Sequence, residues 1–141
     1  MREVHHRYFK NEEIDYIKLK DLLPELLKNS QKQLDNITID GRKLIFITHY
    51  MPSDKFLSTK KDEKTLYKNA FMGSNKLKEF IDMNKFDECY FGHTHRRIPE
   101  TEVDGVLYRC NPVGTLKEWK KWQYVDQDLM SQWKATLLEV K

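Results

Sequence analysis

Two short strand-like runs, each ending at histidines, constrain the fold of this 141-residue chain more than any other feature. Residues 44–47 are all apolar and lead into Thr48 and His49, and residues 87–91 lead directly into Gly92-His93-Thr94-His95. A short, continuous apolar run such as 44–47 predicts a strand that is buried on both faces, as in a parallel sheet. Gly92 is expected to let the backbone turn sharply off the second strand.

One helix is predicted before the first of these runs and another between the two runs. The apolar positions of residues 19–34 follow helical spacing. A second helix, capped by Ser74 or Asn75, is expected to have an apolar face of Leu77, Phe80 and Ile81, which could extend to Met83. Between them, the lysine-rich residues 51–71 predict a long loop with one helical turn near 66–70.

The C-terminal third adds predicted antiparallel strands. Residues 102–110, around Asp104-Gly105, predict a hairpin, residues 111–114 a turn, and residues 135–140 a closing strand. The whole pattern predicts one α/β domain over residues 1–141.

Charge and cysteine content exclude several classes of protein. The chain has 25 basic and 22 acidic residues, a formal net charge of +3, which is too balanced to indicate nucleic-acid or membrane binding by charge alone. Cys89 and Cys110 form no Cys-x-x-Cys motif, so we expect two reduced, buried thiols. No apolar run approaches the ~20 residues of a membrane span, and the first ten residues are too polar for a signal peptide. We therefore expect a cytoplasmic protein.

The strand-end histidines predict a metal site. In α/β sheets ligands bind outside the carboxyl ends of the strands, where His49, His93 and His95 are expected. Imidazole is a common ligand of zinc, iron and manganese. A His-x-His pair alone is weak evidence, and a lone histidine after a strand is more often simply hydrogen-bonded, but the repeated placement favours metal binding. The pair His5-His6 is expected to be solvated.

These motifs resemble a known family. Residues 44–49 followed by Pro52, and then residues 90–95, look like the last two signature motifs of the calcineurin-like metallophosphoesterases, in order and at plausible spacing. Residues 110–114 and Glu118-Trp119 are similar to the strand and turn that follow in that family.

The resemblance implies the C-terminal half of a four-layer α/β/β/α sandwich with a site for two divalent ions, Mn, Zn or Fe. By the family pattern His49 and His93 would bind the second metal and His95 the first. The implied reaction is hydrolysis of a phosphomonoester or phosphodiester. Arg96 and Arg97 would steer the phosphate of the substrate, or would be ordinary exposed arginines. Asn111 would hold a ligand histidine by a hydrogen bond, or would cap a turn.

The family's N-terminal ligand motifs are absent from this sequence. It contains no Asp-x-His, no Gly-Asp and no Gly-Asn-His. We therefore expect that Met1 lies inside a longer ancestral reading frame and that the isolated chain is inactive without the missing N-terminal half. Exposed strand edges at 44–47 or 87–91 would then promote self-association or recruit a partner.

Three alternatives remain open. The histidines could converge on a single metal ion with an open position. The chain could be a non-catalytic metal-binding or interaction protein derived from the same scaffold, or an oligomer that builds a site from two chains. Aromatic residues could form a substrate platform or a partner surface, although core packing is favoured for Trp119, Trp122, Trp133 and Tyr124.

Overall fold

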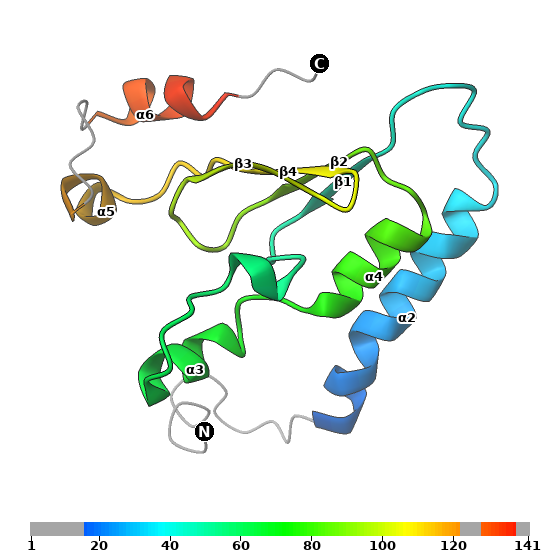
Figure 1. Cartoon of the computed structure of the whole chain (residues 1–141), viewed down its shortest axis with the longest axis horizontal. Coiled ribbons are helices and arrows are strands. Elements are labelled where there is room, and N and C mark those ends of the chain that lie inside the picture. The colour runs from blue at the N-terminus through cyan, green and yellow to red at the C-terminus, as the bar shows by residue number, and fades with distance from the viewer. Residues whose placement is uncertain (1–15, 122–127, 138–141) are drawn as a thin grey trace. The chain divides into compact units, whose positions relative to one another are not determined.

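A four-stranded mixed sheet forms the centre of the computed structural model, which describes residues 16–121 and 128–137 (Figure 1). The strand order is β1-β2-β4-β3. Strands β1 (Ile45–Thr48), β2 (Glu88–Phe91) and β4 (Val106–Cys110) run parallel to one another, and β3 (Ile98–Val103) pairs antiparallel with β4. The α/β class and the hairpin predicted from the sequence are confirmed, whereas the four-layer sandwich stays a prediction.

The chain divides into two units, residues 1–38 and 39–141, and the sheet belongs to the second. The described part of the first unit contains helix α2 (Tyr16–Leu34), which confirms the helix predicted at 19–34. None of the helices in the described ranges is both long and apolar enough to span a bilayer.

One face of the sheet forms an aromatic core. Because side chains alternate along a strand, Phe46, Phe91 and Tyr108 share this face. Ring centroids are 5.9 Å apart for Phe46 and Phe80 of helix α4 (Asn75–Met83), which lies along this face (Figure 1). Full burial of one such side chain contributes roughly 1.5–3 kcal/mol, so the core holds α4 firmly on the sheet.

The start and the apolar face of α4 agree with the sequence. The Ser74 hydroxyl accepts a hydrogen bond from the Lys76 amide, which confirms Ser74 as the capping residue. Leu77, Phe80 and Ile81 of the predicted apolar face are buried, whereas Met83 is exposed, so the extension of the face to Met83 is wrong. A short 3-10 helix η1 (Asp54–Phe56) adds Phe56, whose ring lies 4.7 Å from that of Phe91.

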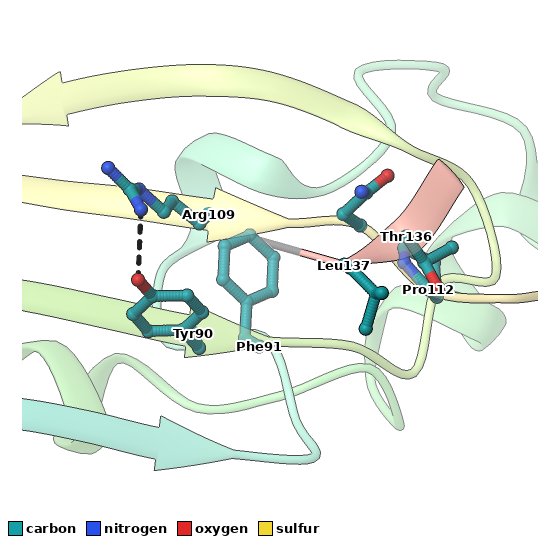
Figure 2. A pocket seen from close by; sticks show the side chains of 7 residues that line it. Tyr90, Phe91, Arg109, Pro112, Thr136 and Leu137 are labelled. Carbon is teal, nitrogen blue, oxygen red and sulfur yellow. Dashed lines mark hydrogen bonds between the residues drawn. The ribbon is translucent and has the colours of Figure 1, made fainter. Parts of the chain in front are cut away.

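The opposite face of the sheet carries a buried polar cluster. The side chains of Glu88 and Arg109 are each only 4% exposed, and Nη1 of Arg109 lies 3.5 Å from Oε2 of Glu88. The Tyr90 hydroxyl donates to Glu88 at 2.9 Å and accepts from Arg109 at 2.9 Å (Figure 2). Burial would raise the pKa of Glu88, but hydrogen bonds from Tyr90 and Lys43 and the charge of Arg109 outweigh it, so the pKa is lowered.

Helix α6 (Leu129–Thr136) lies on this second side of the sheet (Figure 1). A cavity of about 330 Å³ separates its end from the strands, lined by Tyr90, Phe91, Arg109, Asn111, Pro112, Thr136 and Leu137 (Figure 2). The closing strand predicted at 135–140 is therefore wrong at Ala135 and Thr136, which are helical, and its last residues lie outside the described ranges.

The edge of the sheet differs from the prediction in two respects. Strand β1 is an edge strand and Ile47 is 78% exposed, so the expectation of burial on both faces is wrong for β1. Strand β2 is paired on both sides, so the free edge predicted at residues 87–91 is wrong. The free edge predicted at residues 44–47 agrees with the position of β1.

Two further helices complete the second unit. Within the predicted loop at 51–71, helix α3 (Glu63–Asn69) is capped by the Asp62 side chain, and it is longer than the single turn expected. Helix α5 (Leu116–Lys121) buries Trp119, whose indole donates to the Val113 carbonyl at 2.7 Å. Trp133 of α6 is half exposed, against the prediction of core packing, and Trp122 and Tyr124 lie outside the described ranges.

Candidate metal centre

The parallel pairing of β1 and β2 brings His49 and His93 together. Thr48 pairs with Phe91, so both strands end at the same edge of the sheet, and the Gly92 amide donates to the His49 carbonyl at 3.3 Å. Nδ1 of His93 lies 2.9 Å from Nε2 of His49, and the ring centroids are 4.8 Å apart. The two strands are therefore neighbours, and His49 meets His93 at their carboxyl ends.

The spacing of the two ring nitrogens fits two ligands of one metal ion. Nitrogens bound at ~2.1 Å are separated by about 3.0 Å for a bond angle of 90° and about 3.4 Å for a tetrahedral angle. The observed 2.9 Å lies close to the first of these values. Without an ion, the same spacing suits a hydrogen bond from one imidazole to the other.

His95 is held by a carboxylate. Its Nδ1 lies 3.2 Å from Oε1 of Glu118, whose other oxygen accepts from the amide and the hydroxyl of Thr115, each at 2.8 Å. A proton on Nδ1 that is donated to Glu118 leaves Nε2 of His95 as a free electron-pair donor. Metal-binding histidines commonly show this arrangement. Sequence reasoning noted Glu118 only as part of a family-like segment, because 23 residues separate it from His95.

The electrostatics around His93 favour a neutral imidazole. Partial burial lowers the pKa of His93, the neighbouring His49 and His95 lower it further, and a backbone hydrogen bond with Phe71 opposes the shift. The uncharged ring is the form that binds a metal ion, so the environment of His93 is suited to a ligand.

Both histidines of the Gly-His-Thr-His motif have left-handed backbone conformations. The φ angle is +64° at His93 and +55° at His95, whereas Gly92 has no positive φ. The sharp turn expected at Gly92 therefore falls on the histidines. A left-handed conformation costs a residue with a Cβ atom roughly 1–2 kcal/mol, and such strain is typically kept where a side chain must be aimed.

This strain predicts an unusual order of stabilities at position 93. We expect His93→Gly to be more stable than His93→Ala by ~1 kcal/mol, because both variants lose the imidazole and only glycine accepts a positive φ without cost. Urea denaturation of the two variants measures the difference. Equal stabilities, or a more stable alanine variant, would show that the turn is unstrained.

The other predicted site residues are exposed or bonded to helix α6. Arg96 is exposed, while Nη2 of Arg97 donates to the Gln132 side chain in α6 at 2.8 Å. The Asn111 amide donates to the Ala135 carbonyl at 3.1 Å. In residues 16–121 and 128–137, no three His, Cys, Asp or Glu side chains are grouped closely enough to hold an ion together.

These features define a mixed α/β domain with a pair of histidines at the carboxyl edge of two parallel strands. Comparisons of the chain with protein-family models, with curated proteins and with solved structures find no match.

Proposed function

We propose that this chain supplies histidine ligands to a divalent metal centre that hydrolyses phosphate esters. The observation that supports this most strongly is the 2.9 Å spacing of the His49 and His93 nitrogens, which suits two ligands on one ion. The order of the two strand-end motifs in the sequence gives independent support. The ion would be Mn, Zn or Fe, all of which accept imidazole.

Each residue of the proposed centre has one task. His49 and His93 bind one ion, while Glu118 orients His95 toward a second ion at the same strand edge. Bound divalent ions supply a nucleophilic hydroxide at neutral pH and offset charge on the phosphoryl oxygens. Arg96, which is exposed one residue beyond His95, would pair with a phosphate oxygen. Arg97, which is bonded to Gln132, would have to leave that contact to do so.

A complete two-metal centre needs more ligands than these histidines. The resemblance requires carboxylates from Asp-x-His, Gly-Asp and Gly-Asn-His motifs, and this sequence contains none of them. We infer that the bridging carboxylate comes from outside these 141 residues. The isolated chain should then bind metal without effective hydrolysis.

A second candidate function is non-catalytic metal binding or interaction by the same scaffold. It is favoured by the lack, within the described ranges, of any group of three metal-binding side chains. Hydrolysis that appears when the missing ligands are supplied would separate the first candidate from the second.

Metal titration tests the proposed ligands. We expect Mn²⁺ or Zn²⁺ to bind with one dominant site, and His49→Ala and His93→Ala each to weaken that site by at least ~10-fold, since even a hydrogen-bond partner of a ligand has an effect of that size. Isothermal calorimetry on the purified chain measures the affinity. His5→Ala with His6→Ala is the matched control and should leave affinity unchanged. If the His5→Ala/His6→Ala variant loses as much metal affinity as His93→Ala, the metal binds at the N-terminal pair instead.

A further inference from the structure

One exposed aromatic ring contacts the paired histidines, and an exposed aromatic pair lies in the segment that follows. Tyr50 is 50% exposed, and its ring centroid lies 5.1 Å from that of His93 and 5.4 Å from that of His49. Tyr67 and Phe71 are 47% and 53% exposed, and their ring centroids are 5.0 Å apart. Aromatic rings are usually buried, so three exposed rings beside one candidate site call for an explanation.

The Tyr67–Phe71 pair is tied to the histidines through the backbone. The backbone of Phe71 lies close enough to the His93 ring to favour the protonated form of that ring. The next residues are anchored to the loop after β1, because the Met51 amide donates to the Met72 carbonyl at 2.9 Å and Met51 bridges to Gly73. A Cβ atom on Gly73 would lie 1.9 Å from the Met51 carbonyl oxygen, so this close approach requires glycine. The Phe71 backbone therefore lies near His93, and the Tyr67 ring packs beside the Phe71 ring.

Positive charge is concentrated in the same segment. Residues 51–76 contain six lysines and three acidic residues, a net charge of +3, which equals the net charge of the whole chain. One of the acids, Asp62, is occupied in capping α3. The charge balance of the whole chain therefore does not hold for residues 51–76, the segment that carries Tyr67 and Phe71.

We propose that Tyr50, Tyr67 and Phe71, with the lysines of residues 51–76, bind single-stranded nucleic acid across the candidate metal centre. Bases of any identity stack on aromatic rings, and lysines neutralise the phosphates between the bases. Tyr50 and the Tyr67–Phe71 pair offer more than one stacking position, which favours a strand of several nucleotides over a mononucleotide. The placement of a phosphodiester at His49 and His93 rests on the proposed function, whereas the binding itself does not.

Fluorescence anisotropy with a labelled 12-residue oligothymidylate tests this surface. The measurement is made with EDTA and at low salt, so that metal binding does not contribute. We expect the wild-type chain to bind, and the Tyr67→Ala/Phe71→Ala double variant to bind at least ~10-fold more weakly, since one base–aromatic stack is worth about 1–3 kcal/mol. The double variant Lys64→Gln/Lys68→Gln should instead reduce the salt dependence of binding.

The controls separate stacking from charge and from loss of folding. Trp133→Ala removes an equally exposed ring from α6 and should leave binding unchanged, and circular dichroism checks that each variant is folded. Unchanged affinity of Tyr67→Ala/Phe71→Ala, or competition by polyglutamate as effective as that by unlabelled oligonucleotide, would overturn the proposal. Equal competition by a mononucleotide would overturn its claim of a multi-nucleotide ligand. If the wild-type chain fails to bind the oligonucleotide but still binds metal at His49 and His93, the nucleic-acid surface is refuted and the proposed function is not.

Discussion

Phosphodiester hydrolysis by this chain is expected to rise by roughly three or more orders of magnitude when the missing ligand motifs are supplied, because two-metal stabilisation of attacking and leaving oxygens is worth several kcal/mol. The isolated chain should hydrolyse a nitrophenyl phosphodiester barely above background in Mn²⁺ or Zn²⁺. A segment that carries the family's Asp-x-His, Gly-Asp and Gly-Asn-His motifs would supply these ligands. Co-expression of that segment with the chain, followed by a nitrophenolate assay, measures the gain.

The same assay shows which histidines the restored activity requires. In the restored enzyme, His93→Ala or His95→Ala should abolish the gain, while His5→Ala and His6→Ala should leave it nearly unchanged. Turnover by the purified 141-residue chain with metal alone would contradict the need for outside carboxylates. A single metal ion held by His49, His93 and His95 would then be the better explanation.

Arg109→Met is expected to destabilise the fold by up to about 3–5 kcal/mol, because it leaves the buried carboxylate of Glu88 with only the half-exposed Lys43 as a cationic partner. Chemical denaturation monitored by circular dichroism measures the free energy of unfolding. The matched control is Glu100→Gln. Glu100 contacts the same guanidinium at 3.4 Å but is 55% exposed, and exposed pairs contribute about 1 kcal/mol or less.

A double variant distinguishes a lost ion pair from lost packing. If Arg109 acts mainly by balancing Glu88, then Glu88→Gln combined with Arg109→Met should cost clearly less than the two single changes added together. Additive losses would indicate that the guanidinium contributes chiefly by packing between Tyr90 and its neighbours.

The sequence predicted the framework of the site because that framework depends on local signals. An apolar run ending in a histidine, a serine before a helix, and an Asp-Gly turn are each visible within a few residues, and β1, α4 and the β3–β4 hairpin follow from them. The meeting of His49 and His93 followed from one topological rule, that parallel strands end at the same edge of a sheet.

The remaining features depend on contacts that no local pattern encodes. The run at 44–47 is as apolar as that of a central strand, yet Ile47 is 78% exposed, because the sheet face that it shares with Tyr90 is not covered at β1. The Glu118–His95 contact needs α5 to lie beside the motif, and the Arg97–Gln132 contact needs α6. The sequence predicted a strand at residues 135–140, but Asp128 caps helix α6, which continues through Thr136.

A crystal of the chain grown with Mn²⁺, recorded at a wavelength where manganese scatters anomalously, tests the central claim most directly. The account predicts one strong anomalous peak ~2.1 Å from both Nε2 of His49 and Nδ1 of His93, the two atoms that face each other in the ion-free geometry. A peak bound to other residues, or no peak with His49 and His93 still hydrogen-bonded to each other at saturating manganese, would contradict it.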